Sequence, residues 1–204
     1  MPDKAFSFVL VGVGGQGTVL ASDVLAELGL RLGYDVKKAE VHGMSQRGGS
    51  VVSHVRWGPQ VFSPIISRGE ADFLIAFEKL EAARALDWLR PGGTLLVNDY
   101  RIDPVTVSSG DALYPEDGAI KAAAGGVAGR VSWIPASQIA EQLGGMRVSN
   151  VVLLGALAAL LADSADPAAW DAALTGRIPE KYAELNRRAF AAGRDYRIPQ
   201  PPAP

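Results

Sequence analysis

The sequence predicts an α/β fold in three layers, with a mixed, mostly parallel sheet and a helical C-terminal part. Apolar runs of strand length alternate with helical patterns between residues 6 and 97, as they do in strand-helix-strand units. A glycine-rich turn ends the first run and opens the first helix, and beyond residue 137 only helical patterns remain. These observations predict one Rossmann-like domain over residues 1–193 and an extended Pro-rich tail over residues 194–204.

The first strand-helix-strand unit is predicted from residues 6–41. Residues 6–13 form an apolar run that enters a tight turn, as a buried strand does. A helix then ends at Gly33, and its apolar residues recur at spacings near 3.6, namely Val19, Leu20, Val24, Leu25, Leu28 and Leu32. Residues 35–41 predict the second strand. Only nine residues, 42–50, precede the alternating run 51–57, and a parallel crossover needs about a dozen or more. We therefore expect 51–57 to be antiparallel and the sheet to be mixed.

A second parallel unit is predicted from residues 71–97. Residues 58–69 read as a loop and 71–77 as a strand. The next helix is predicted to end at Pro91–Gly93, before a strand at 94–97, and its apolar stripe consists of Ala82, Ala85, Leu86 and Leu89.

The remaining chain is predicted to be irregular at first and then helical. Residues 99–129 are polar and rich in glycine, and we expect excursions over the surface there. Residues 130–134 read as an edge strand because Pro135 follows. Further helices are predicted at 137–143, from an Asn150 cap to Leu161, from Pro167, and at 179–192, before the Pro-rich residues 198–204.

Composition excludes several classes of function. The chain has 204 residues, 20 Lys+Arg, 22 Asp+Glu and a net charge of −2, which argues against a nucleic-acid scaffold. It has no cysteine, so disulfides, a catalytic thiol, a zinc ribbon and thiolate-held clusters are excluded, and redox chemistry needs a bound cofactor or a partner's metal centre. The most apolar stretch, residues 151–162, is too short to span a bilayer, and no signal peptide is recognisable at the N-terminus. We expect a cytoplasmic protein.

Gly12-x-Gly14-x-x-Gly17 follows a strand and opens a helix. In that context, glycines permit positive φ, and the helix N-terminus offers N–H groups to a phosphate or carboxylate. A free-standing NAD(P)- or FAD-binding oxidoreductase is one alternative, with Glu40 as the acidic ribose ligand. The short connection after Val41 and the bulky Gln16 weaken it. A purely structural turn remains a further alternative.

A second unusual segment spans residues 42–50. It carries Gln46, Arg47, Gly48 and Gly49 at the carboxyl end of a strand, where open α/β sheets bind ligands. The Arg47 guanidinium suits a phosphate or carboxylate, although a solvated hairpin has the same composition. Asn98 ends a strand and is a candidate for the same crevice or for a simple turn. The two histidines have no metal-ligand spacing, no nucleophile elbow or Walker loop is present, and we predict neither a catalytic residue nor a metal site.

The two glycine segments together resemble a known family. The turn at residues 12–17, followed by Gln46-Arg47-Gly48-Gly49, resembles the gamma-type subunit or domain of 2-oxoacid:ferredoxin oxidoreductases. Residues 42–56 resemble the small beta subunits of indolepyruvate ferredoxin oxidoreductases almost throughout. The likeness extends over roughly residues 6–162.

The resemblance implies that this chain is one part of a hetero-oligomeric enzyme and is inactive alone. A large alpha-type subunit would carry thiamine diphosphate, Mg and [4Fe-4S] clusters, decarboxylate an arylpyruvate and pass electrons to ferredoxin. Coenzyme A would be the co-substrate that accepts the acyl group. No cofactor is expected on this chain, in agreement with its lack of cysteine, and neither nucleic acid nor a membrane is an expected partner.

These motifs lead to a hypothesis about the site. We expect Gly14, Gly15, Gln16 and Gly17 to form an anion-receptive rim with Gln46, Arg47, Gly48, Gly49 and Asn98. This rim would dock the partner or hold coenzyme A phosphates; a scaffold that binds no ligand is the remaining alternative. If the core leaves the apolar helix at residues 151–161 exposed, we expect the partner to cover it.

Overall fold

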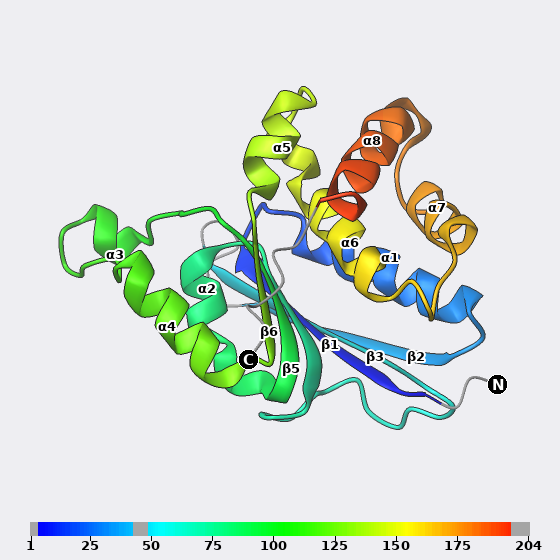
Figure 1. Cartoon of the computed structure of the whole chain (residues 1–204), viewed down its shortest axis with the longest axis horizontal. Coiled ribbons are helices and arrows are strands. Elements are labelled where there is room, and N and C mark those ends of the chain that lie inside the picture. Colours follow the sequence, from blue (N-terminus) through cyan, green and yellow to red (C-terminus); the bar gives the residue numbers. More distant parts are fainter. Residues whose placement is uncertain (1–3, 43–48, 197–204) are drawn as a thin grey trace, which may run out of the picture.

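The computed structural model describes residues 4–42 and 49–196, with the backbone alone at His42. A six-stranded sheet in the order β2-β3-β1-β4-β5-β6 crosses the molecule (Figure 1). Its strands are β1 (Phe6–Val13), β2 (Asp35–His42), β3 (Ser50–Gly58), β4 (Ala71–Ala76), β5 (Leu89–Asn98) and β6 (Arg130–Ile134). Strands β1, β4, β5 and β6 are parallel to their neighbours in this series, whereas β3 is antiparallel to both β1 and β2. The predicted mixed sheet is confirmed.

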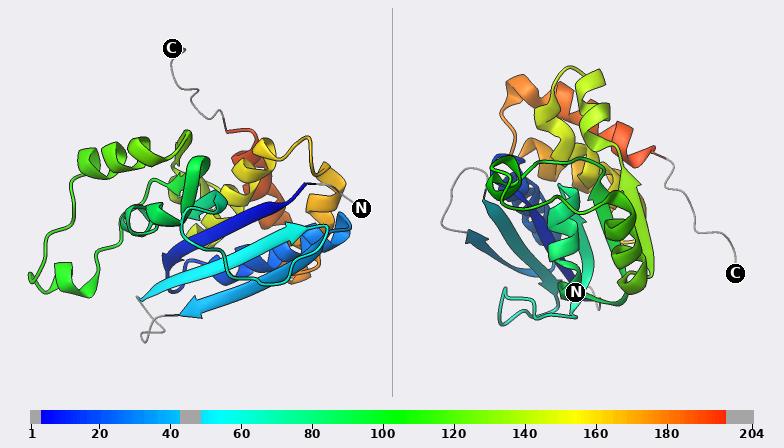
Figure 2. Two further views of the ribbon diagram at one scale, coloured as in Figure 1. Left: turned by 90° about the horizontal axis from the view of Figure 1, so that it is seen from below. Right: turned by 90° about the vertical axis from the view of Figure 1, so that its left-hand side faces the viewer.

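Helices cover both faces of the sheet, which gives the three predicted layers (Figures 1 and 2). On one face lie α1 (Thr18–Arg31), α5 (Ala136–Gln142), α6 (Ser149–Leu160), α7 (Pro167–Thr175) and α8 (Ala183–Arg194). On the other lie α2 (Lys79–Arg84) and α4 (Asp117–Val127). A hydrophobic core lies on each face of the sheet, and β1 contributes to both. Phe8 and Leu10 pack into the core that includes α1 and α6, and Val9 and Val11 pack into the core that includes α2 and α4, because successive side chains of a strand point to opposite faces.

Short elements complete the chain. A four-residue helix, α3 (Val105–Ser108), stands away from the sheet at one side of the molecule (Figure 1). The described residues also form the 3₁₀ turns η1 (Leu86–Trp88), η2 (Met146–Val148) and η3 (Glu180–Tyr182). No helix in the described part of the chain is long and apolar enough to cross a membrane.

The apolar helix α6 is enclosed by the chain itself. Its residues from Asn150 to Ala158 are all buried, and α5, α8, α1 and β5 pack around it. Helix α8 approaches so closely that a Cβ on Gly155 would lie 2.0 Å from the carbonyl oxygen of Phe190. A partner was expected to cover this helix only if the core left it exposed, and that condition is not met, because α8 already covers it. Asn150 lies within the first turn and is not the N-cap, which is Val148.

Two further expectations differ from the structure. The helix after β4 ends at Arg84 and not near Pro91, because Leu89 already pairs with Ala71 in β5 and Gly92, at φ +75°, lies within that strand. The stretch predicted as irregular contains α4, whose Ile120 and Ala124 are buried beside the sheet. Their spacing of four residues is a helical signal, but the adjacent Gly125 and Gly126 obscure it.

Candidate functional site

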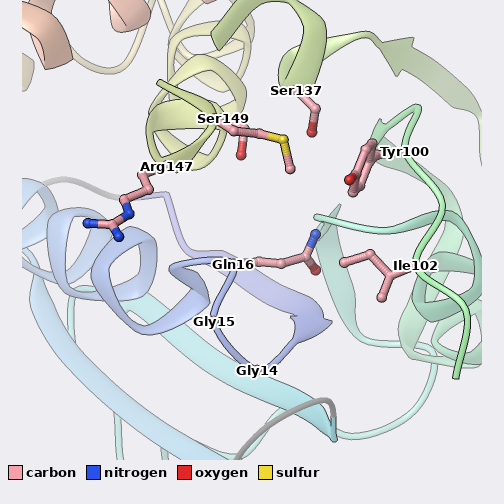
Figure 3. A pocket seen from close by; sticks show the side chains of 9 residues that line it. Gly14, Gly15, Gln16, Tyr100, Ile102, Ser137, Arg147 and Ser149 are labelled. Atoms are coloured by element: carbon pink, nitrogen blue, oxygen red, sulfur yellow. The ribbon is translucent and has the colours of Figure 1, made fainter. Parts of the chain in front are cut away.

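An open pocket of about 290 Å³ lies at the carboxyl end of β1. Figure 3 shows Gln16 near its centre, with Arg147 and Ser149 on one side and Tyr100 and Ile102 on the other. Four separate segments therefore build it: the turn after β1, the segment after β5, the start of α5, and η2 with the start of α6. Its lining consists of Gly14, Gly15, Gln16, Tyr100, Ile102, Ser137, Met146, Arg147 and Ser149.

Gln16 holds the glycine turn against the end of β4. Its Oε1 accepts a hydrogen bond from the backbone N–H of Val13 at 2.8 Å, and its Nε2 donates to the carbonyl oxygen of Phe77 at 2.8 Å. Gly15 and Gly17 adopt φ of +103° and +78°, which favours glycine at both positions. The side-chain amide is thus used to fix the turn, and the chemistry that the turn offers to a ligand comes from its backbone.

The two glycine motifs meet in space. The N–H of Gly14 donates to the carbonyl oxygen of Gly49 at 2.9 Å. Gln46, Arg47 and Gly48 lie outside the described residues. The contact occupies the Gly14 donor, whereas the N–H groups of Gly15 and Gly17 have no hydrogen-bond partner among residues 4–42 and 49–196. Of these two residues, Gly15 lines the pocket and Gly17 does not, so the N–H of Gly15 is the donor that the turn can offer to an anion there.

Two helix N-termini converge on the pocket. Helix α1 starts after Gly17 and α6 starts at Ser149, and neither has a side-chain cap or an acidic residue in its first turn. Asn150 joins the two ends, since its Nδ2 donates to the carbonyl oxygen of Gly17 at 3.2 Å. The partial positive charges of both helix dipoles therefore lie beside the pocket without a neutralising carboxylate on their first turns. This arrangement favours an anionic ligand.

Arg147 adds a full positive charge. It lines the pocket and is exposed, and it makes no ion pair or hydrogen bond with any described residue. A cation just before a helix N-terminus opposes the helix dipole, so its place is unfavourable for α6 itself. The sequence analysis did not identify Arg147. A basic residue directly before a predicted helix was the signal that could have found it.

Asn98 lies behind the pocket wall. It is 1% exposed, its Nδ2 donates to the carbonyl oxygen of Phe77 and to Ser137 Oγ, and its Oδ1 accepts from the Ser137 N–H. Its amide is therefore fully used inside the protein, and Ser137 is the group that reaches the pocket. The carbonyl of Phe77 accepts from both Gln16 and Asn98, so one hydrogen-bond network supports two walls.

A buried carboxylate supports the opposite wall. Glu78 is 1% exposed and accepts from the N–H of Ile102 at 3.2 Å and from the Tyr114 hydroxyl at 2.5 Å. Burial, with the hydrogen bond to the Glu78 carboxylate, raises the pKa of the Tyr114 phenol. Tyr114 therefore remains a neutral donor at physiological pH.

Neither a metal site nor the acidic ligand of a dinucleotide fold is found at the pocket among the described residues. Within the described ranges no cluster of three or more His, Asp or Glu side chains could hold a metal. His54 lies away from the pocket, where its Nδ1 accepts from the Ile66 N–H and burial lowers its pKa. Strand β3 lies between β1 and β2, so Glu40 is not beside the glycine turn, as the acidic ligand of a dinucleotide fold would be.

Comparison with known proteins agrees with the resemblance of the motifs. The family described as pyruvate ferredoxin/flavodoxin oxidoreductase matches residues 7–196. The indolepyruvate oxidoreductase subunit IorB of Thermococcus kodakarensis is 37% identical over 191 residues, which cover 93% of this chain and 95% of that protein. The ketoisovalerate oxidoreductase subunit VorA of Methanothermobacter thermautotrophicus is 28% identical over 92% of this chain but only 35% of its own length.

A solved structure agrees with the fold. The gamma subunit of a keto/oxoacid ferredoxin oxidoreductase from Geobacter sulfurreducens superposes with a TM-score of 0.67 at 26% identity, over 92% of this chain and 95% of that one. Sequence and fold lead to the same conclusion: the chain belongs to the pyruvate ferredoxin/flavodoxin oxidoreductase family.

Proposed function

We propose that this chain is the small subunit of an indolepyruvate:ferredoxin oxidoreductase and that its pocket holds phosphate groups of coenzyme A. Full-length similarity to an IorB subunit supports the first part. The second part depends on one observation, the convergence of two uncapped helix N-termini and the unpaired Arg147 on one pocket. Phosphate is the ligand group that such a combination of donors and charge favours.

The other groups that the reaction needs do not fit this chain. Iron–sulfur clusters need thiolate ligands, and the sequence has no cysteine. The described residues also offer no carboxylate cluster for Mg. Thiamine diphosphate, Mg and the [4Fe-4S] clusters therefore belong to the large alpha-type subunit in this proposal, with ferredoxin as the electron acceptor. Coenzyme A supplies the thiol that accepts the acyl group.

The small subunit then acts by binding and orientation. The N–H group of Gly15, which lines the pocket, donates to a phosphate oxygen, and the Arg147 guanidinium neutralises the charge of the phosphate. Ser137 and Ser149 offer hydroxyls from the other walls. At 290 Å³ the pocket admits only part of coenzyme A, which leaves its thiol end free to extend toward the large subunit. Holding the phosphates reduces the loss of rotational freedom when the thiol reacts.

Substitution of Arg147 in the assembled complex tests the proposal. Coexpression with the large subunit should give a complex that oxidises indolepyruvate, with phenylpyruvate and pyruvate as comparison substrates. Arg147→Ala should raise the KM for coenzyme A about tenfold and leave the KM for the oxoacid unchanged. Arg188→Ala, at an exposed position in α8 outside the pocket, is the matched control. If the complex assembles and the KM for coenzyme A is unchanged, the proposal that the pocket binds phosphate is wrong, and the alternative of a scaffold that binds no ligand is favoured.

A further inference from the structure

Residues 101–116, which we name the arm, leave the sheet after β5 and return to it at α4. None of these residues is buried. The arm carries α3 at its outer end, and two perpendicular views show that end standing away from the rest of the molecule (Figures 1 and 2). Ile102 and Tyr114, at the base of the arm, are half-buried, whereas the outer part of the arm is mostly exposed. The hydrophobic core therefore does not account for the conformation of the outer part or for its apolar side chains.

Two large apolar side chains of the arm are almost fully in water. Leu113 is 94% exposed and Val105 is 79% exposed. Single exposed apolar residues are common and need no explanation. Here, however, both lie on a segment that projects from the surface, where burial by another protein would stabilise a complex by about 1.5–3 kcal/mol for each side chain.

The base of the arm is held in place by buried charges. Ile102 at its start and Tyr114 near its end both donate to Oε1 of Glu78, so one carboxylate closes the loop. The Arg101 guanidinium lies 4.2 Å from the centre of the Tyr114 ring. The adjacent Lys79, also buried, pairs with Asp117 at 2.7 Å where α4 begins. Much of the ordering that a partner would otherwise impose is already present in the free chain.

The arm starts at the pocket. Ile102 belongs both to the arm and to the pocket wall, and Tyr100 lies beside it (Figure 3). A protein that covers the arm therefore also lies next to the pocket. In the VorA relative this chain matches only 35% of the polypeptide, so there the corresponding region is joined to a longer chain.

We propose that the arm docks into an apolar groove on the large subunit, burying Val105 and Leu113, and thereby places the large subunit against the pocket. This inference rests on the proposed function. Asp111 and Glu116 flank Leu113 and make no ion pair with any described residue, so the groove is expected to have Lys or Arg at its rim. The enclosed helix α6, by contrast, has no apolar face left for a partner.

Binding of the purified large subunit tests the arm directly. The doubly substituted chain Val105→Asp/Leu113→Asp should bind about 100-fold more weakly than the wild type. Its melting temperature should be unchanged, because neither residue is buried. Phe62→Asp is the matched control: Phe62 is 87% exposed but lies with Ala5 and Ser7 near the amino end of β1, at the opposite edge of the sheet. The affinity of Phe62→Asp for the large subunit should lie within about twofold of the wild-type value.

Each other outcome has a definite meaning. If the arm variant binds the large subunit with wild-type affinity and the complex is active, the inference that the arm is the docking segment is overturned, and the proposed function remains intact. An equal loss in Phe62→Asp shows that the arm is not the specific contact and also overturns the inference. A wild-type chain that dimerises alone, and becomes monomeric on arm substitution, identifies a second copy as the occupant. A wild-type chain that never binds the large subunit contradicts the proposed function as well.

Discussion

The side-chain amide of Asn150 donates to the carbonyl oxygen of Gly17, and this single contact joins the N-termini of α1 and α6 across 133 residues of sequence. The two ends are packed so tightly that a Cβ on Gly17 would lie 2.3 Å from Asn150 Nδ2. Gly17 is therefore required for two independent reasons, its φ of +78° and the amide beside it. The contact therefore holds together two of the segments that build the pocket.

Gly17→Ala should destabilise the protein by about 2–4 kcal/mol, because a left-handed alanine costs about 1–2 kcal/mol and the clash with Asn150 adds a similar amount. Urea unfolding monitored by circular dichroism gives the free energy of unfolding. Gly110→Ala is the control, since Gly110 has a similar φ of +85° with open space around it. It should show the conformational cost alone, and equal losses in the two variants would contradict the role of Asn150.

Gln16→Glu tests the network that supports the turn. The substitution keeps the size of the side chain but replaces the Nε2 donor, so that an oxygen faces the carbonyl oxygen of Phe77. The Phe77 carbonyl keeps its hydrogen bond from Asn98 Nδ2. The loss of the Gln16 bond and the repulsion between the two facing oxygens should still lower the free energy of unfolding by about 1–3 kcal/mol. Gln60→Glu, on the exposed loop after β3, should change stability by less than about 0.5 kcal/mol. Similar losses at both positions would show a nonspecific effect of added charge.

The sequence predicted those features that follow from local pattern. The turn at residues 12–17, the antiparallel strand β3 and the edge strand β6 all lie where periodicity and loop length placed them. Gly14 and Gly49, one from each glycine motif, are hydrogen-bonded, whereas the anion-receptive rim stays a prediction. Each of these features depends on a few consecutive residues and a fixed repeat.

Features that depend on tertiary contacts were not predictable in this way. Pro91–Gly93 reads locally as a helix stop, yet pairing of Leu89 with Ala71 makes the segment part of β5. Asn98 reads as a ligand residue, yet its amide is used by Phe77 and Ser137. Arg147 joins the pocket only because the η2 turn comes to lie beside residues 14–16, more than 130 positions earlier in the chain.

Acid should weaken the contact between α2 and α4. The hydrogen bond from the Lys79 ammonium lowers the pKa of Asp117, so this carboxylate stabilises the fold at a pH above its unfolded pKa of about 3.9. That stabilisation is lost as the pH falls through the lower, folded-state pKa. Asp117→Asn should therefore be less stable than the wild type at pH 7 and should approach it as the pH falls through the lowered, folded-state pKa of Asp117. The control Asp163→Asn, at an exposed position without an ion pair among the described residues, should parallel the wild type at every pH. A constant difference between Asp117→Asn and the wild type would contradict the assignment.

The close crossing of α6 and α8 depends on two glycines, one in each helix, and each faces the backbone of the other helix. A Cβ on Gly155 would lie 2.0 Å from the carbonyl oxygen of Phe190, and one on Gly193 would lie 1.8 Å from that of Val152. Neither backbone can move without separating the helices that enclose the core. Gly155→Ala should therefore destabilise the protein by about 3 kcal/mol or more.

The same substitution in α4 should have the opposite sign. Gly125 also lies within a helix, but no atom lies within 4 Å of a Cβ placed on it. Gly125→Ala should stabilise the protein by about 0.5–1 kcal/mol, because alanine restricts the unfolded chain and favours the helix. Thermal unfolding of the two variants side by side separates helix propensity from packing, since propensity alone predicts that both will stabilise. A stabilised Gly155→Ala variant would mean that α8 can move away from α6, and the close crossing would then not be a requirement of the fold.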